Sequence, residues 1–539
     1  MSGIGRWVLA GTAIVGAAAP AAAAVPGEAI RRHATVLASD AFEGRGPGSP
    51  GGERAVGYLV QQLERAGVAP LFEGGYTQPV PLVGTRALSS SRLTLSHLGA
   101  DRALELGAEY LLVTTGAQTV VPRSTPIVFV GYGIVAPEYD YNDYADVDVA
   151  GKVVAFLEGE PPSSEETYFS GKQPSVHASV ETKQRVALSR GAVGSIVLLD
   201  GNASEAQWER LSREYAFEHM TLASTLPRHL SLILHPHLTD ELFADALYSA
   251  EQVRRMHDTH TMRSFHLRQS LTFEGSFAER SFLSANVGGI VHGTHRGDAN
   301  TFVVVTAHWD HLGVGPPVDG DAIYNGLVDN ALGVAAVLEL ARELAAAPTR
   351  RSVIVLFPTA EERGLLGSVH FLRHAPVPVA QIVAAVNVDG LAHLSRFEDV
   401  VAIGGDLSDL GRNVERVARD LGLEASPPPA VWSRHAFLHS DQVAFAEAGV
   451  PSVMIQEGFR WPGVSFEEAL ARSVWWILTR YHSPDDEVGP EVDWPATTAH
   501  AGLVAEVVRS IADAAVPPRW RPGVRYGYER AVSQARSRR

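Results

Sequence analysis

The chain has 539 residues, a formal net charge of −16, 45% hydrophobic residues and no cysteine. Its length accommodates two or three domains with full cores. The acidic balance argues against nucleic acid and anionic membranes as main partners, and the absence of cysteine excludes disulfides, thiolate metal ligands, a cysteine nucleophile and a lipoprotein anchor.

The first residues have the pattern of an export signal. Arg6 precedes an apolar stretch over 7–18, and small residues over 20–25 suit cleavage near Ala24. A transmembrane anchor is the competing interpretation, but Gly and Ala dilute this stretch, which falls short of about 20 strongly apolar residues. We therefore expect a signal peptide over 1–24, a periplasmic or secreted protein, and no membrane partner after cleavage.

The next segment predicts the first part of an α/β domain. Residues 30–71 have the pattern of a helix, a turn-rich loop over 42–52 and a second helix. The loop lacks the lysine and the spacing of a phosphate-binding loop. Short antiparallel strands are expected near 78–83 and 92–95, which extends this part of the domain over 27–122.

From about residue 121 the pattern changes to apolar strands that alternate with helical segments. Strands are predicted at 126–130, 153–157 and 194–199, and no cluster of metal-binding type follows them. His257, Asp258 and His260 could be proposed as ligands, but no apolar strand leads to them, so a solvated polar stretch is the better interpretation. We expect a smaller inserted domain over 123–285.

The main domain resumes near residue 286 and contains four polar clusters. Three follow apolar, β-branched runs that are typical of buried parallel strands, and one opens a helical pattern. The clusters are A-H-W-D-H over 307–311, D-N-A-L-G over 329–333, E-E-R-G over 361–364 and N-V-D-G over 387–390. Because sites in open α/β sheets form beyond the carboxyl ends of the strands, we expect these side chains to meet at one rim.

These residue types suit a pair of divalent metal ions, because zinc accepts His nitrogen and carboxylate oxygen. His308 is the natural first ligand, and Asp310 is placed to accept the other imidazole N–H. Asp329, at a helix start, is placed to bridge two ions. Asp389 completes a second ion, and His482, in Y-H-S-P-D-D over 481–486, supplies the missing histidine.

The adjacent glutamates divide the remaining roles. One of Glu361 and Glu362 can bind metal while the other stays free as a general base. Each motif alone is weak evidence for a metal site. An aspartate at a helix start is more often a helix cap, and a lone histidine more often lies on the surface. The order of the elements, H-x-D, D-N, E-E-x-G, N-V-D-G and Y-H, carries the prediction.

With these motifs the sequence resembles the M28 metallopeptidases, which include two-zinc aminopeptidases and the glutamate carboxypeptidase and transferrin-receptor branch. The resemblance extends to E-G-R-G over 43–46 and to the inserted region, which is similar to a protease-associated (PA) domain. It implies a three-layer α/β/α sandwich over 27–122 and 286–517, interrupted by a PA-like, β-rich domain. Residues 518–539 form a basic tail that we expect to be disordered or lightly docked.

The resemblance also assigns roles to residues. It implies two zinc ions per chain, bound by five ligands, and Glu361 as the general base. It further implies Asp310 as the partner of His308, Tyr481 as a donor to the oxyanion, and a cis peptide after Asp329. Leu332 stands where the family usually has serine, but this is not a ligand position. The implied ligands are His308, Asp329, Glu362, Asp389 and His482.

The charges of the predicted pocket indicate whether the enzyme recognises the N-terminus or the C-terminus of a peptide. A terminal carboxylate needs cationic groups, ideally Arg, and the predicted pocket segment over 441–459 has no Lys or Arg. This favours an aminopeptidase whose first side chain enters an apolar wall around Val453 and Ile455. Arg434, in the preceding loop, keeps a glutamate-carboxypeptidase-like enzyme open as the alternative.

Other classes of protein are less consistent with the sequence. It has no G-x-S-x-G of a serine hydrolase and no H-E-x-x-H of a thermolysin-type site. A non-catalytic binding protein on the same scaffold would be expected to have lost ligands, and glutaminyl-cyclase-like transferases typically lack the inserted domain. The sequence identifies neither the physiological peptide nor the oligomeric state.

Overall fold

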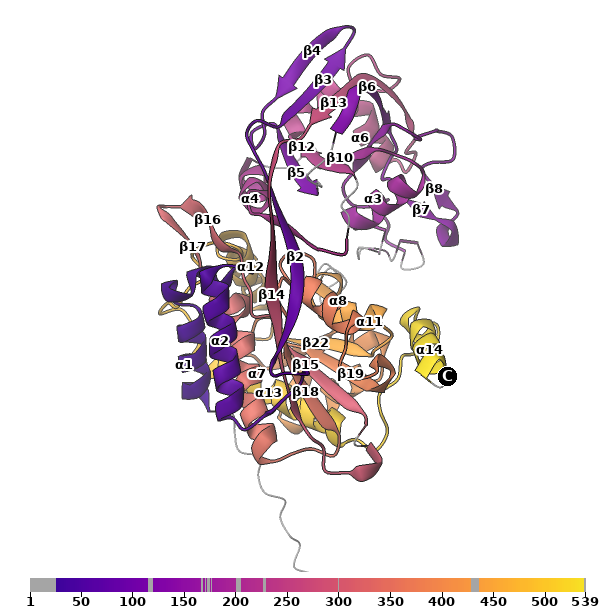
Figure 1. Cartoon of the computed structure of the whole chain (residues 1–539). Helices are drawn as coiled ribbons and strands as arrows, with labels where there is room; N and C mark the ends of the chain where they lie inside the picture. Colours follow the sequence, from indigo (N-terminus) through magenta and orange to yellow (C-terminus); the bar gives the residue numbers. More distant parts are fainter. Residues whose placement is uncertain are drawn as a thin grey trace, which may run out of the picture.

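The computed structural model describes residues 26–114, 120–165, 168–169, 171, 175, 177–199, 205–225, 229–298, 300–427 and 436–537. Two bodies are visible, each built on its own sheet, and two long strands connect them (Figure 1). The predicted signal peptide and Arg434 lie outside the described residues. None of the described helices has the length and hydropathy needed to cross a bilayer.

The larger body is organised around a ten-stranded mixed sheet. Four central strands, β18, β15, β19 and β22, run parallel to one another. β14 and β20 pair with this group in antiparallel fashion. In sheet order the strands are β11 (His219–Leu222), β2 (Thr77–Ala87), β14 (Phe277–Val291), β18 (Ser352–Phe357), β15 (Phe302–Thr306), β19 (Ile382–Asn387), β22 (Ser452–Glu457), β20 (Asp399–Ile403) and β21 (Glu424–Ala425), with β1 (Ala69–Pro70) beside β14.

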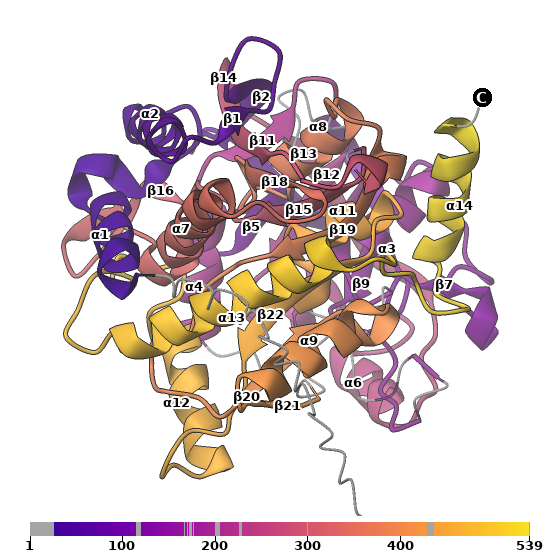
Figure 2. The same ribbon diagram turned by 90° about the horizontal axis from the view of Figure 1, so that it is seen from below.

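Helices cover both faces of this sheet, which makes three layers (Figure 2). Successive side chains of a strand point to opposite faces, so Val303 and Val305 join the core on one face while Phe302 and Val304 join the core on the other. The first face carries α1 (Gly27–Leu37), α2 (Pro50–Arg65), α7 (Leu332–Ala346), α9 (Leu410–Asp420) and α13 (Trp494–Asp513), and the second carries α8 (Leu366–Arg373) and α11 (Gln442–Glu447). The fold predicted from the sequence is confirmed.

The smaller body contains an eight-stranded sheet. Its centre is again parallel, with β9 between β6 and β10, and β12 beyond β10. In sheet order the strands are β4 (Ala100–Leu104), β3 (Arg92–His97), β13 (Phe265–Glu274), β6 (Val120–Phe129), β9 (Val153–Leu157), β10 (Gly194–Leu198), β12 (Leu230–Leu234) and β5 (Tyr110–Thr114). Its helices are α3 (Val180–Ser189), α4 (Glu205–Tyr215), α5 (Thr239–Leu242) and α6 (Ala250–Asp258).

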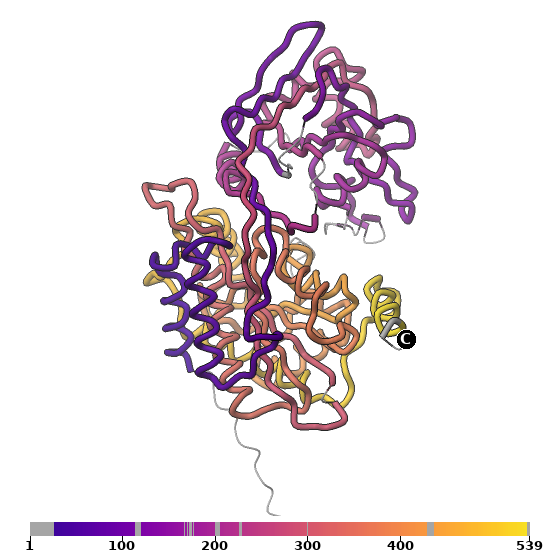
Figure 3. The backbone as a smooth tube through the Cα atoms, viewed as in Figure 1, coloured from indigo at the N-terminus to yellow at the C-terminus, as the bar shows by residue number. Residues whose placement is uncertain are grey.

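The sheets place the boundary of the inserted domain differently from the sequence prediction. β3, β4 and β5 precede residue 123 but belong to the smaller sheet, whereas β11 lies inside 123–285 but pairs with β2 in the larger one. The reason is the β2–β14 ribbon, which is paired from Thr77 and Val287 to Ala87 and Phe277 and runs from one body into the other (Figure 3). A domain edge at 122/123 is therefore wrong.

The remaining elements are divided between the two bodies. α12 (Phe466–Thr479) precedes His482, and the hairpin of β16 (Gly313–Val318) and β17 (Asp321–Tyr324) follows the first polar cluster. β7 (Val135–Ala136) and β8 (Tyr141–Asn142) form a second small hairpin, in the smaller body. The tail ends in α14 (Tyr526–Ser537), where Tyr526 joins an apolar cluster with Met454, so its described part is docked.

Candidate metal centre

The predicted ligands come from different elements that end at one rim of the larger sheet. His308 follows β15, Glu361 and Glu362 follow β18, and Asp389 follows β19. Because these strands are parallel, their carboxyl ends lie side by side. Asp329 lies just before α7, and His482 lies three residues after α12. The structure brings all of these side chains together.

The first half of the cluster is formed by His308 and two aspartates. Nε2 of His308 lies 3.2 Å from Oδ1 of Asp389 and 3.3 Å from Oδ1 of Asp329. The imidazole is buried, with 1% of its surface exposed. Three donors that converge at this spacing suit a divalent ion.

The second half of the cluster is formed by His482 and the other oxygen of Asp329. Nε2 of His482 lies 3.2 Å from Oδ2 of Asp329 and 3.0 Å from Oε2 of Glu362, yet it makes no hydrogen bond of acceptable geometry. Each carboxylate oxygen of Asp329 therefore faces a different histidine, as a ligand that bridges two ions requires.

The peptide bond between Asp329 and Asn330 is cis, which confirms the prediction. The side chain of Asn330 binds the backbone on both sides of Asp389. Its Nδ2 donates to the carbonyl of Val388 at 2.8 Å, and its Oδ1 accepts from the N–H of Gly390 at 3.1 Å. These two bonds fasten the segment of Asp329 to the segment of Asp389.

Both neighbouring glutamates lie within reach of the cluster. Among the described residues, donor atoms close enough to share an ion occur in two groups: Glu361 joins His308 and Asp389 in one, and Glu362 joins His308 and Asp329 in the other. Glu362 also approaches His482, which favours it as the ligand. The division into base and ligand stays a prediction.

The site carries an excess of negative charge that calls for cations. Burial raises the pKa of Glu361, and the carboxylates of Asp389 and Glu362 add to this, so that the pKa lies well above its ordinary value. Burial lowers the pKa of His308, but the carboxylates around it outweigh burial and raise the pKa well above its ordinary value. Two divalent cations would compensate this buried charge, so the residues present fit a two-metal centre.

Asp310 has a different contact from the one predicted. Its carboxylate lies 4.0 Å from Nδ1 of His308, which is too long for a hydrogen bond. Nδ1 of His308 instead lies 3.1 Å from the backbone carbonyl of Asp310, and the carboxylate accepts the backbone N–H of Glu361 at 3.2 Å. The backbone of Asp310 thus orients His308, and its side chain positions Glu361.

His311 is a site residue that the sequence pattern did not single out. It is completely buried, and its Nδ1 lies 2.7 Å from Oε1 of Glu362 and 3.7 Å from Oδ2 of Asp329. It lies three residues after His308 in A-H-W-D-H, and this second histidine is the signal that could have indicated it. His311 orients Glu362.

Asp486 and Arg45 hold the segment that carries Asp329. Asp486 accepts the backbone N–H groups of Val328 and Asp329 at 3.0 and 3.1 Å. The guanidinium of Arg45 is buried and donates to five backbone carbonyls, those of Leu37, Trp309, Asn325, Gly326 and Asp329. Gly44 makes room for this approach, because a Cβ there would lie 2.4 Å from the carbonyl oxygen of Tyr324.

Tyr481 lies at the entrance of the centre. Its ring stacks on that of His482, with centroids 3.8 Å apart and an interplanar angle of 20°, and 41% of its surface is exposed. It lines a cavity of about 480 Å³ together with Asp329 and Asp389. Its predicted role toward an oxyanion stays a prediction.

This cavity has apolar walls and opens onto the cluster. Its apolar residues include Val401, Ile403, Met454, Phe459, Trp476 and Ile477. The predicted wall around Val453 and Ile455 is wrong, because both side chains are fully buried in the core on the other face of β22. Strand alternation instead presents Met454 and Gln456 to the cavity.

A buried pair of metal-binding half-sites at the carboxyl end of a parallel sheet, beside an apolar cavity, defines a metal-dependent hydrolase. Residues 289–508 of the chain match the model of peptidase family M28.

Known proteins agree with this assignment. The alkaline phosphatase isozyme conversion protein of Escherichia coli is 26% identical over 255 residues, which are 44% of this chain and 72% of that protein. An aminopeptidase of Pseudomonas aeruginosa is 37% identical over 125 residues, which are 23% of this chain and 21% of that protein. The chain thus spans about a fifth of that aminopeptidase. The fold resembles that of an aminopeptidase from Aneurinibacillus sp. strain AM-1, with a TM-score of 0.55, 18% identity, and coverage of 90% of this chain and 93% of the other.

Proposed function

We propose that this protein is an exported two-zinc aminopeptidase that releases single residues from free N-termini. The observation that carries the proposal is the position of Asp329, whose two carboxylate oxygens face His308 and His482 respectively. One ion would be held by His308, Asp389 and Asp329, and the other by His482, Glu362 and Asp329. Two imidazoles and three carboxylates suit zinc, and manganese or cobalt could replace it.

Zinc at such a centre supplies an acidified water and a polarised scissile carbonyl. The residues of this chain supply the proton transfer. Glu361 takes a proton from the attacking water and delivers it to the leaving amine. The carboxylate of Asp310 fixes the backbone N–H of Glu361, which limits the positions that this base can adopt. The hydroxyl of Tyr481 donates to the oxygen that becomes negative in the tetrahedral state.

Recognition of an N-terminus is supported by the charges of the cavity. The described residues that line it include Asp329, Asp389 and Glu457 and contain neither Lys nor Arg. An α-ammonium group has carboxylates within this space, whereas a C-terminal carboxylate has no Lys or Arg partner among the described residues of the lining. The aminopeptidase names of the Pseudomonas relative and of the Aneurinibacillus structure point in the same direction.

The proposal is tested with three substrate types: amino-acid 4-nitroanilides with a free amine, their N-acetylated forms, and an N-blocked peptide with a C-terminal glutamate. We expect hydrolysis of the free-amine anilides alone, abolished by a chelator and restored by zinc. Efficient release of the C-terminal glutamate would instead assign the protein to the carboxypeptidase branch. A fully metallated protein that hydrolyses none of the three would favour a binding scaffold.

Export is tested separately. Expression in a Gram-negative host with the native N-terminus should give a mature protein that starts near residue 25 in the periplasm or medium, as read by N-terminal sequencing. A protein that retains residues 1–24 in the cytoplasm would contradict the export proposal.

A further inference from the structure

Gln456 is a polar residue of the cavity wall that the proposed chemistry does not use. It belongs to a patch of four lining residues, because Met454 and Gln456 of β22 pair with Ile403 and Val401 of β20 in antiparallel register. Residues that pair in this way place their side chains on the same face of the sheet. The other three are apolar, and a polar group placed in such a wall is the kind of feature that orients a ligand.

The register of the parallel strands places Gln456 beside Asp389. Asn387 of β19 pairs with Met454 of β22, and Asp389 and Gln456 each follow two residues later along the chain. The side-chain Nε2 of Gln456 donates to the backbone carbonyl of Asp389 at 2.7 Å. Gln456 therefore lies between a predicted metal ligand and the apolar part of the wall.

The bond to Asp389 also fixes the orientation of the Gln456 amide. A backbone carbonyl can only accept, so the nitrogen of the amide must face Asp389 and the oxygen, Oε1, points away from that carbonyl. Among the described residues Oε1 has no hydrogen-bond partner, and it is not fully buried. Since the residue as a whole is half-buried, Oε1 is a sheltered acceptor that is open to a ligand.

The position of this acceptor determines which part of a peptide meets it. In the proposed reaction the scissile carbonyl lies at the metal cluster, and the α-carbon of the first residue is bonded directly to that carbonyl. An acceptor beside Asp389 therefore meets a group attached to the α-carbon, while the apolar patch receives the side chain. The α-ammonium group at this carbon carries charged N–H donors, which form stronger hydrogen bonds than neutral donors.

We propose that Oε1 of Gln456 accepts a hydrogen bond from the α-ammonium group of the substrate. The inference rests on the proposed aminopeptidase function and adds to it a residue that recognises the free N-terminus. Asp329 and Asp389 also line the cavity, but their carboxylates are committed to the ions in the proposed centre. Gln456 supplies an acceptor that stays free when the ions are bound.

The test compares leucinol with 4-methylpentan-1-ol, which differs from it only in lacking the amine. Neither compound has a bond that a peptidase hydrolyses, and calorimetric titration of the zinc-loaded protein measures Kd for both. Gln456→Met keeps the length of the side chain and removes the acceptor. We expect this variant to bind leucinol about 10- to 100-fold more weakly than the wild type, the range of a hydrogen bond to a charged group, and to bind 4-methylpentan-1-ol equally well.

Gln456→Glu separates the proposed role from the bond to Asp389, because glutamate keeps acceptor oxygens and lacks the donor to that carbonyl. We expect Gln456→Glu to bind leucinol at least as tightly as the wild type does. Gln61→Met is the matched control, since Gln61 is exposed on α2, outside the cavity (Figure 1). Both of its dissociation constants should equal those of the wild type.

Three results would overturn the inference. One is a wild type that binds leucinol no more tightly than 4-methylpentan-1-ol, which can be read even if a variant does not fold. Another is a Gln456→Met variant that keeps the wild-type preference for leucinol. The third is an equal loss for both ligands in Gln456→Met, a loss of zinc from it, or an equal weakening in Gln456→Glu, each of which would assign Gln456 to holding the segment of Asp389.

These binding measurements do not depend on turnover, so they separate the inference from the proposed function. A protein that hydrolyses no free-amine anilide, yet loses its preference for leucinol in Gln456→Met, contradicts the proposed function and supports amine recognition by Gln456. A protein that hydrolyses the anilides and keeps this preference in Gln456→Met supports the proposed function and overturns the inference.

Discussion

The two sheets of this protein share a parallel centre, but their strand ends differ in chemistry. In the larger sheet β15, β18 and β19 are followed by His308, the Glu361–Glu362 pair and Asp389. In the smaller sheet β6 is followed by Val130 and Gly131, and the end of β9 is capped by Lys183, which donates to the carbonyls of Leu157 and Gly159. One rim collects metal ligands, and the other is closed by a buried cation.

This difference shows that a parallel sheet provides a place for a site and the residues after its strands decide the chemistry. At the metal centre the buried charges are mostly carboxylates, which require added cations. In the smaller body Lys183 donates to carbonyl groups, and nearby acidic side chains offset part of the effect of its burial, so that rim already contains its own buried basic group. We therefore expect substitutions at the two rims to have different consequences.

The largest expected effect is at the glutamate pair. Glu361→Gln should retain both metals and lower kcat by about 10²- to 10⁴-fold, the contribution of a positioned base. Glu362→Gln should lose metal as well as activity. Metal analysis of both purified variants beside kcat measurements separates the two roles. If Glu361→Gln lost metal and Glu362→Gln kept it, the two roles would be exchanged.

The next effect concerns Asp486, which holds the backbone N–H groups of Val328 and Asp329. Asp486→Asn should weaken zinc binding by about 10- to 100-fold, as is typical when a partner that orients a ligand is changed. Competition with a chromophoric chelator measures this affinity. Asp485→Asn is the control, because Asp485 is the exposed neighbour, and an equal loss in both variants would contradict a role specific to Asp486.

A smaller effect is expected from Arg45, because it acts on the fold around the centre. Arg45→Lys cannot reach five carbonyls with one ammonium group and should lower the free energy of unfolding by about 2–3 kcal/mol. Denaturant unfolding of the apo protein measures this. Arg54→Lys, in an exposed pair with Glu43, should be near neutral, and two equally destabilised variants would argue against a special role for Arg45.

The smallest effect is expected in the inserted body. Burial lowers the pKa of Lys183 to about 7, so between pH 7 and about 10.5 the unfolded chain binds more protons at this residue than the folded one. Its contribution to stability is thus present above pH 10.5 and is lost as the pH falls toward 7. Lys183→Met should reduce the gain in Tm between pH 7 and 9 and leave metal content unchanged.

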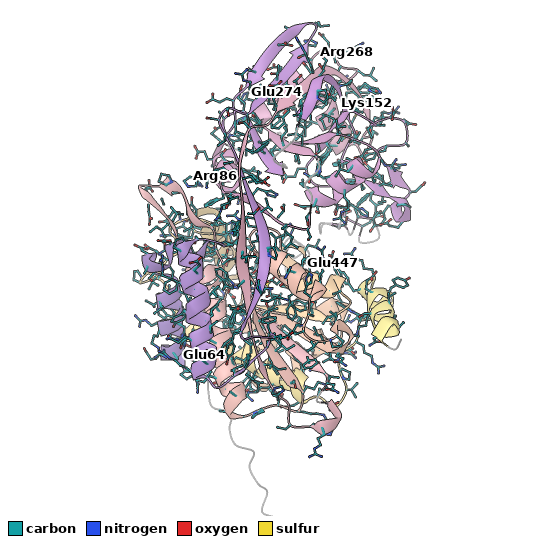
Figure 4. The ribbon with its side chains drawn as sticks, in the orientation of Figure 1. Glu64, Arg86, Lys152, Arg268, Glu274 and Glu447 are labelled. Carbon is teal, nitrogen blue, oxygen red and sulfur yellow. The ribbon has the colours of Figure 1, made fainter. Side chains whose placement is uncertain are left out.

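Lys152→Met is the control for this pH effect, because Lys152 forms a more exposed pair with Asp148 in the same body (Figure 4). Its gain in Tm between pH 7 and 9 should match that of the wild type. An unchanged gain in Lys183→Met would refute the assignment of this titration to Lys183.

The sequence was sufficient to predict that the five candidate ligand side chains meet at one rim, because apolar strands and short polar clusters are local signals; their role as metal ligands stays a prediction. The sequence was insufficient where a feature depends on how distant segments of the chain pair with one another. Whether Val453 or Met454 faces the cavity depends on the orientation of β22 in the sheet, and the domain edge depends on the β2–β14 ribbon. Likewise, His311 and Asp486 are recognised only by their contacts with Glu362 and the segment of Asp329.

The central claim, two ions that share Asp329, is tested most directly by metal stoichiometry. The protein is loaded with zinc, dialysed exhaustively and analysed by mass spectrometry of the intact native chain. We expect two zinc ions per wild-type chain, and a population with fewer than two in Asp329→Asn. One ion or none in the wild type would contradict the bridged centre.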